Sequence, residues 1–139
     1  MKDIVDLLGR FLLAVLFLFE AYDAIAHFQT VQEKMTTYGL TWRQDLFLVG
    51  VISCIILGST LVLLGYRAGF GAFLLFCYWI PVAFMVHSFW AYPKDEQVVQ
   101  MDLLFKDLAI GGGLLLVIAS GAGKYSVKRL FSTFKVSGA

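Results

Sequence analysis

The stretch Ile4–Phe28, IVDLLGRFLLAVLFLFEAYDAIAHF, decides how the chain can fold. It is long and apolar enough to cross a bilayer as one helix, for which about 20 mostly apolar residues suffice. Its second half nevertheless carries Glu20, Asp23 and His27, at a spacing that places them on one helical face. A spanning helix does not carry such a row without a cause. We therefore expect the function to depend on what meets this face.

The composition is that of a membrane protein. Of the 139 residues, 60% are hydrophobic and 15% are charged, and the mean hydropathy is +0.81. An average globular domain is about 45–50% apolar and about 25% charged. The net charge of +1 is too small to indicate nucleic acid as a partner, so the bilayer is the expected surroundings.

Four apolar segments predict membrane-spanning helices. They cover about residues 4–27, 46–64, 68–89 and 103–120. Because the connections between them are short, we expect a single domain over residues 1–139, an all-α integral membrane four-helix bundle. The first segment does not read as a cleavable signal, since its apolar run is too long and no small-residue cleavage site follows it.

The distribution of Lys and Arg predicts the orientation of this bundle. The N-terminus, the second connection and the C-terminus share one side, which carries Lys2, Arg10, Arg67, Lys124, Lys128, Arg129 and Lys135. The other side carries Lys34, Arg43 and Lys94, with Lys106 just inside the fourth helix. This bias favours both termini in the cytoplasm of a bacterial or archaeal cell, with the protein in its cytoplasmic (inner) membrane. Arg10 is expected to extend its charged end to the membrane interface.

The two cysteines and the first connection have structural interpretations. Cys54 and Cys77 lie in apolar helices without a CxxC motif, so we expect small buried hydrophobic side chains rather than a redox pair. The first connection, about residues 29–45, is polar and includes Tyr38 and Trp42, which are typical of interfacial anchors.

The alternation of four helices predicts a cluster of ionisable side chains in one half of the bundle, the half away from the termini. The residues expected there are Glu20, Asp23, His27, His87, Lys106 and Asp107. An ionised side chain at mid-membrane costs about 2.5–3.5 kcal/mol on insertion scales, so these groups should pair or face a polar pocket. One interpretation is a pocket that binds a small ligand or handles protons, with Lys106 as counter-charge. The alternative is a clasp of buried ion pairs that only fixes the helices.

The sequence contains no independent catalytic or redox-cofactor motif. His27 and His87 could ligate haem or copper with Met85 nearby, but no CxxCH motif or dense His/Met cluster accompanies them. We therefore expect no metal site and no haem, and no catalytic residue can be assigned.

Four segments carry a family resemblance: residues 7–28, LGYRAGFGAFLL at 64–75, VHSFW at 86–90 and LLFKDLAIGGGLLLVIASGAGKYS at 103–126. In their order and spacing the chain resembles the DoxX family of small four-helix membrane proteins. The resemblance implies a subunit of a membrane redox or respiratory-type complex, with other subunits or further copies of the chain as partners. It also implies quinone or lipid as the ligand of the polar pocket. The alternatives are a non-catalytic structural or assembly protein and a small-solute carrier.

Overall fold

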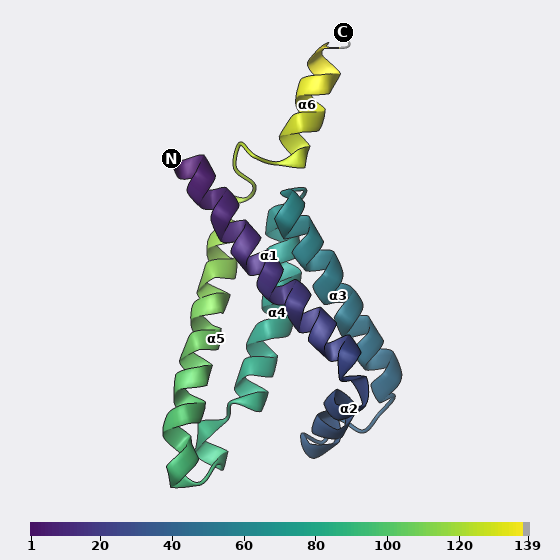
Figure 1. The fold of residues 1–139 in the computed structure, drawn as a ribbon, viewed down its shortest axis with the longest axis vertical. Coiled ribbons are helices and arrows are strands. Elements are labelled where there is room, and N and C mark those ends of the chain that lie inside the picture. The colour runs from purple at the N-terminus through teal and green to yellow at the C-terminus, as the bar shows by residue number, and fades with distance from the viewer. Residues whose placement is uncertain (138–139) are drawn as a thin grey trace.

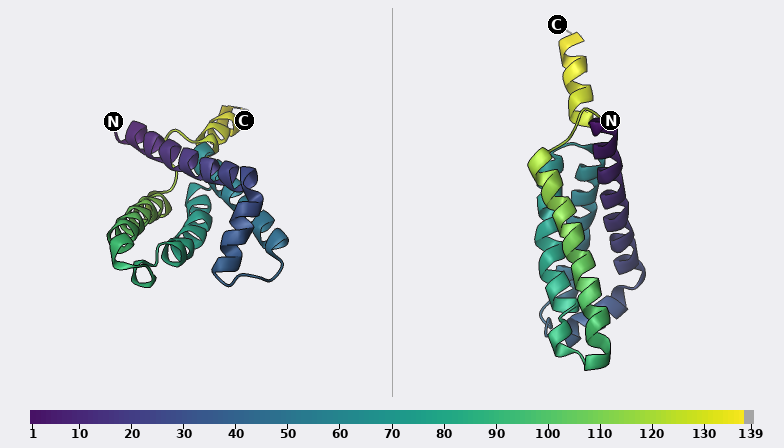
Figure 2. Two further views of the ribbon diagram at one scale, coloured as in Figure 1. Left: turned by 60° about the horizontal axis from the view of Figure 1, so that its bottom comes forward. Right: turned by 90° about the vertical axis from the view of Figure 1, so that its left-hand side faces the viewer.

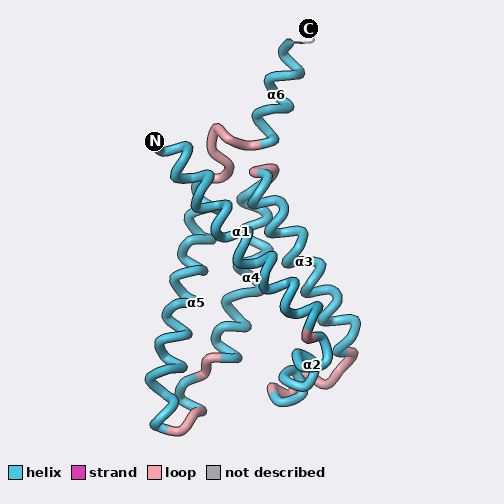
Figure 3. The backbone as a smooth tube through the Cα atoms, in the orientation of Figure 1, coloured by secondary structure: helices cyan, strands magenta, loops and turns pink. Residues whose placement is uncertain are grey.

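The computed structural model describes residues 1–137, and all the regular structure in this range is helical. The elements are α1 (Lys2–Ala26), α2 (Phe28–Thr37), α3 (Gln44–Leu64), α4 (Ala68–Val86), the 3₁₀ helix η1 (Phe89–Ala91), α5 (Lys94–Ser120) and α6 (Val127–Ser137). Short loops join them (Figure 3). The predicted all-α class is confirmed.

Three of these segments are long and apolar enough to cross a bilayer: Gln44–Leu64, Ala68–Ala91 and Lys94–Ser120. They correspond to the second, third and fourth predicted spans. The first predicted span forms α1, a helix of 25 residues, but it is not among these candidates. Its apolar stretch contains Arg10, Glu20 and Asp23. Each of the other three helices has an apolar stretch of similar length with fewer charged residues.

The helices form an open bundle in which the successive long helices α1, α3, α4 and α5 run in alternating directions. Helix α3 packs against α4 and α4 against α5, while α1 crosses over α3 and meets α5 less extensively (Figures 1 and 2). Both chain ends and the turn between α3 and α4 lie at one end of the molecule, here called the termini end. Helix α2 and η1 lie at the opposite end, here called the loop end. Helix α6 points away from the bundle beyond the termini end.

Two helical segments differ from the sequence prediction. Helix α5 begins at Lys94 rather than near residue 103, and Asp95 and Glu96 in its first turn interact favourably with the positive end of the helix dipole. Helix α6 was not predicted. Its signal is the apolar spacing of Val127, Leu130, Phe131 and Phe134, which is typical of an amphipathic helix.

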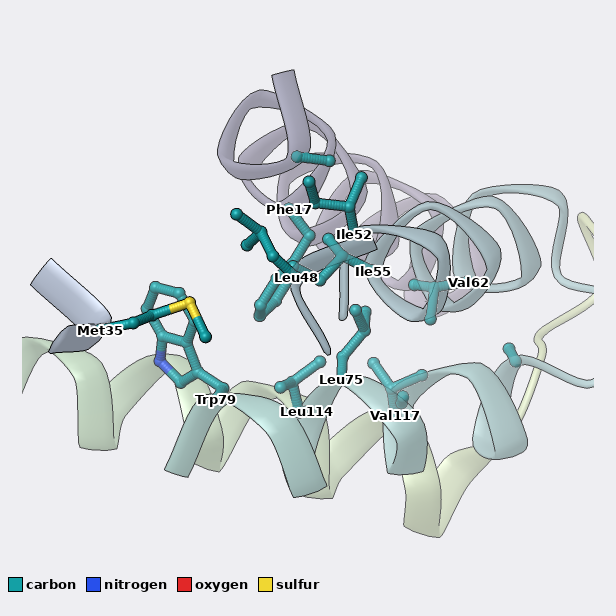
Figure 4. Close-up of a cluster of buried hydrophobic side chains, with 13 residues drawn as sticks. Phe17, Met35, Leu48, Ile52, Ile55, Val62, Leu75, Trp79, Leu114 and Val117 are labelled. Atoms are coloured by element: carbon teal, nitrogen blue, oxygen red, sulfur yellow. The ribbon is translucent and has the colours of Figure 1, made fainter. Parts of the chain in front are cut away.

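An apolar core joins α1, α3, α4 and α5 (Figure 4). The buried residues of α1 recur every three or four positions, as one helical face requires: Arg10, Ala14, Phe17 and Ala21. The Phe17 ring meets Trp79 of α4 edge-on, with ring centroids 5.1 Å apart. Met35 brings α2 into the same core near Trp79. The charged α1 is therefore fixed by its apolar face.

Close contact between α3 and α4 depends on two glycines. A Cβ added to Gly58 would lie 3.0 Å from the carbonyl oxygen of Gly71, and one added to Gly71 would lie 2.7 Å from that of Gly58. Small residues at such crossings let helix backbones approach closely within a membrane, where no hydrophobic force drives helices together. The two glycines therefore set the distance between α3 and α4.

A buried polar network, here called the termini clasp, closes the termini end. Arg10 is 1% exposed, and its Nε donates to Asp6 Oδ2 at 2.9 Å. Its Nη2 donates to the Tyr125 carbonyl at 2.7 Å, and its Nη1 approaches the Val62 carbonyl at 3.4 Å. The Gly123 N–H donates to the same Asp6 oxygen at 3.2 Å. The expectation that Arg10 extends to the interface is therefore wrong: protein acceptors from three segments hold it inside.

The local backbone makes room for this clasp. Gly65 has φ 69°, in the left-handed region that favours glycine, and it ends α3 next to the Val62 carbonyl. A Cβ on Gly65 would lie 2.5 Å from Arg10 Nη1, and one on Gly123 would lie 2.7 Å from Asp6 Oδ2. Since the last carbonyls of a helix lack partners within it, the guanidinium also satisfies the end of α3.

The cysteines are placed differently from the prediction. Cys54 and Cys77 are exposed at the surface of the protein and are not buried in its core. Both line an apolar groove between α3 and α4. They were expected to be buried because their helices are apolar throughout, so the sequence carries no periodicity that marks the lipid-facing side.

A glycine substitution tests the packing of α3 on α4. We expect Gly71→Ala to lower the free energy of unfolding by about 1–3 kcal/mol, because the methyl group would overlap the Gly58 backbone. Gly112→Ala is the matched control, since a Cβ there meets nothing within 4 Å and alanine favours the helix. The measurement is unfolding of the purified protein in detergent micelles. Equal effects of the two changes would contradict this account.

The termini clasp predicts a strong dependence on Asp6. We expect Asp6→Asn to destabilise the protein by about 3–5 kcal/mol, because it leaves the buried Arg10 charge without its carboxylate. Asp3→Asn removes the same charge from an exposed pair with Lys124, at 3.8 Å, and should cost less than about 1 kcal/mol. The same unfolding measurement compares them, and a small effect at Asp6 would show that the clasp is not needed for stability.

Candidate functional site

A polar pocket of about 230 Å³ lies between α1, α4 and α5, in the half of the bundle nearer the loop end. Its charged and aromatic lining is Glu20 from α1, Tyr78, Trp79 and His87 from α4, and Asp107 from α5. Small and branched apolar side chains of α4 complete the wall: Val82, Ala83 and Val86. Three helices that are distant in sequence thus contribute acidic, basic and aromatic groups to one space.

The local structure explains how each group reaches the pocket. Glu20 lies three residues after Phe17 and directly before Ala21, at the border of the buried face of α1. His87 ends α4, where its backbone N–H still bonds to the Ala83 carbonyl at 2.9 Å. Asp107 projects from α5 one turn before Gly111, at which an added Cβ would lie 2.6 Å from Ile80 Cδ1 of α4. The close approach of α5 to α4 therefore carries Asp107 to His87.

His87 lies between an amide and a carboxylate. Its Nδ1 is 2.8 Å from Gln100 Oε1, and its Nε2 is 3.4 Å from Asp107 Oδ2. An amide oxygen only accepts, so Nδ1 carries the proton in this arrangement. In a neutral imidazole Nε2 is then an acceptor, and a hydrogen bond to Asp107 requires one further proton on either group. The imidazole and the carboxylate thus lie side by side at the pocket wall.

Trp79 fixes the position of α5 against this pair. Its indole Nε1 donates to the Asp107 carbonyl at 3.1 Å, and its ring packs edge-on against Phe17. Both contacts restrict the indole, which in turn restricts the main chain that carries the Asp107 carboxylate. Trp79 is a positioning residue here, since its polar group bonds within the protein.

Glu20 has no such partner. Among the described residues, none forms a hydrogen bond or ion pair with its half-buried carboxylate. The lining also holds the carboxylate of Asp107, and His87 is the one basic residue in it. The pocket therefore has an excess of negative charge when its carboxyl groups are ionised.

The other three candidates, Asp23, His27 and Lys106, lie outside the pocket, and each forms an ion pair with a residue four positions away. Asp23 Oδ1 and His27 Nδ1 are 3.0 Å apart on the exposed face of α1. Lys106 Nζ is 2.9 Å from Asp102 Oδ2, four residues earlier on α5, and both side chains are exposed. The six predicted residues therefore do not form one cluster, and Lys106 is not the counter-charge of Glu20 or Asp107. Pairs at this spacing satisfy each other within one helix, which removes the reason to face inward.

Sequence reasoning missed Gln100, Tyr78 and Trp79. Gln100 lies seven residues before Asp107, two turns along one helical face, but the helix was expected to begin after it. The two aromatic residues occur in an apolar run without periodicity and carry no signal of their own. Within residues 1–137, no group of three or more His, Cys, Asp or Glu side chains is arranged to hold a metal ion.

Tyr38, directly after α2, lies near Tyr92, which precedes α5. Partial burial raises the pKa of Tyr38 above its usual value, and the neighbouring Tyr92 raises it further. The Tyr92 hydroxyl also donates to the Val86 carbonyl at 3.2 Å. These contacts join the segment between α2 and α3 to the segment between α4 and α5 at the loop end, next to His87.

Comparison of the sequence with known proteins identifies the family of this chain. The profile of the SURF4 family matches residues 1–131. The Surfeit locus protein 4 homolog of Schizosaccharomyces pombe is 32% identical over 92 residues, which cover 64% of this chain but only 29% of that protein. The inner membrane protein YqjF of Escherichia coli K12 is 26% identical over 133 residues, 95% of each chain. No solved structure matches.

These matches correct the resemblance drawn from the sequence. The order and spacing of the apolar segments suggested the DoxX family, but short apolar helices match one another easily, and the family profile over nearly the whole chain is a different one. The expected redox complex and its quinone rested on that resemblance and lose their support. The helices and the relatives together describe an integral membrane protein, and the chain belongs to the SURF4 family.

Proposed function

We propose that this protein binds a small cationic group, of the protonated amine class, in the polar pocket. Glu20 and Asp107 would face the positive charge, with His87 beside Asp107 in the same lining. Asp23, His27 and Lys106 lie in surface pairs and have no part in this proposal.

The unpartnered carboxylate of Glu20 carries the proposal. An uncompensated charge within the membrane region costs about 2.5–3.5 kcal/mol or more, and such residues are rarely kept without a role. A cation in the pocket would compensate Glu20, which no described residue of the chain does. Tyr78 and Trp79 belong to the same lining, and the faces of aromatic rings attract bound ammonium groups.

A clasp without a ligand is the second candidate, and a specific contact favours it. His87, Asp107 and Trp79 connect α4 to α5, as a purely structural network would. Glu20 belongs to none of these contacts, however, so a clasp leaves its carboxylate unexplained. The two candidates therefore predict different effects of removing the Glu20 charge: a loss of ligand binding for the cation site, and a loss of stability for the clasp.

The pocket also bears on how the chain crosses the membrane. We propose four spans, with α1 as the first and both termini in the cytoplasm. Arg10 is satisfied inside the termini clasp, Glu20 faces the pocket and Asp23 pairs with His27 near the end of α1, so none of the three charges has to meet lipid without a partner or a pocket. The excess of Lys and Arg at the termini end supports this orientation in the cytoplasmic membrane of a bacterium or archaeon.

Binding of n-butylammonium to the full chain in lipid nanodiscs tests the function. Titration calorimetry should show saturable binding that Glu20→Gln weakens roughly 10- to 100-fold, as expected when a charged hydrogen bond is lost. Asp23→Asn is the matched control, because it removes the same charge from the same helix outside the pocket, and it should leave the affinity unchanged. Neutral n-butanol should not compete.

The opposite results would support the clasp. If n-butylammonium does not bind, or if both variants bind it equally, the pocket is not a cation site. A loss of stability on Glu20→Gln, measured by unfolding in the absence of ligand, would assign the carboxylate to the structure of the bundle. A gain in stability would agree with the proposal, since the ligand-free carboxylate is uncompensated.

A further inference from the structure

A second concave surface lies on the other side of α4 from the polar pocket. This α3–α4 groove has a volume of about 720 Å³ and is lined almost wholly by apolar side chains. Its volume falls in the range of about 300–1,000 Å³ that is typical of sites for small molecules. Tyr78 and Val82 line both spaces, so they form the wall between them.

The groove has a cationic group at one end. Arg43 lines it at the start of α3, where the backbone has φ 42°, and its side chain is exposed. Among residues 1–137, no carboxylate or carbonyl oxygen accepts a hydrogen bond from the Arg43 guanidinium. Its recorded neighbour is the ring of Trp42, whose centroid lies 6.0 Å from Arg43 Cζ. The charge is thus available to a partner outside the chain.

Trp42 indicates the depth at which this charge lies. Its side chain is 83% exposed, and exposed tryptophans at the ends of spanning helices sit at the level of lipid headgroups. Arg43 is the next residue, so it lies at the same level. From there the groove follows α3 past Gly50 to Cys54, over roughly 16 Å at 1.5 Å per residue. A cationic group thus lies at one end of an apolar groove that follows α3.

We propose that the α3–α4 groove is a binding site for one anionic phospholipid. Its phosphate would pair with Arg43 at the headgroup level, and an acyl chain would lie along the groove beside Cys54 and Cys77. A guanidinium matches phosphate oxygens in a bidentate manner, which gives retention beyond that of the lipid around any membrane protein. The inference rests on the embedding of the protein in a membrane and is independent of the polar pocket.

Retention of lipid by the full chain tests this site. The protein is reconstituted in vesicles of phosphatidylcholine and phosphatidylglycerol, extracted in mild detergent and weighed intact by native mass spectrometry. We expect one retained phosphatidylglycerol, reduced roughly tenfold relative to the wild type in Arg43→Gln. Arg67→Gln is the matched control: Arg67 also precedes a spanning helix with positive φ, 48°, but it lies at the termini end outside the groove.

A second pair of variants tests the apolar part of the groove. Gly50 lines it, and a Cβ there meets nothing within 4 Å, so Gly50→Phe fills the groove without disturbing the helix packing. It should abolish lipid retention and the protection of Cys54 from a maleimide by added phosphatidylglycerol. Gly112→Phe, at an equally open position on α5, should change neither.

Three results would overturn the proposal. Retention that Arg43→Gln and Gly50→Phe leave unchanged would place any bound lipid elsewhere. Equal retention of phosphatidylcholine and phosphatidylglycerol by the wild type would remove the role of the charge. A disulfide between Cys54 or Cys77 of two copies, formed efficiently in vesicles, would identify a second copy of the chain as the occupant.

Discussion

The buried guanidinium of Arg10 is the contact on which the arrangement of helices depends most. Among the residues whose burial is described it is the one charge that the bundle encloses almost completely, and its partners come from α1, from the end of α3 and from the segment between α5 and α6. Removing a charge from water without partners would cost several kcal/mol. These three segments must therefore meet at one point, and that requirement fixes where α1 crosses the other helices.

The polar groups at the loop end are not balanced in charge as Arg10 and Asp6 are. At the termini end Asp6 matches the buried charge of Arg10 within the chain, but at the loop end the pocket holds two carboxylates and a single imidazole. The protein confines this imbalance to a small space next to a rigid aromatic contact, Phe17 against Trp79. The aromatic contact makes one wall of the pocket rigid, and the charge in the pocket is unmatched. Such a pocket is suited to a ligand that brings the opposite charge.

Much of the helical architecture could be predicted from the sequence, because long apolar runs leave few alternatives in a membrane. The same argument from alternating helices brought Glu20, His87 and Asp107 to one level, and the structure places these three in one pocket. It failed for Lys106 because Asp102, one turn away, satisfies its charge locally. The partners of Arg10 could not be predicted, since they include main-chain carbonyls of Val62 and Tyr125, which no side-chain pattern reveals.

The termini clasp also has a consequence for how the protein is made. Arg10 and Tyr125 are 115 positions apart, and the ribosome adds about 5–20 residues per second, so on the order of ten seconds separate the synthesis of the two partners. During that time the Arg10 charge has the Asp6 carboxylate on α1 as its partner, but not yet the Tyr125 carbonyl. The first helix to emerge therefore completes its contacts only after the segment that follows α5 has been made.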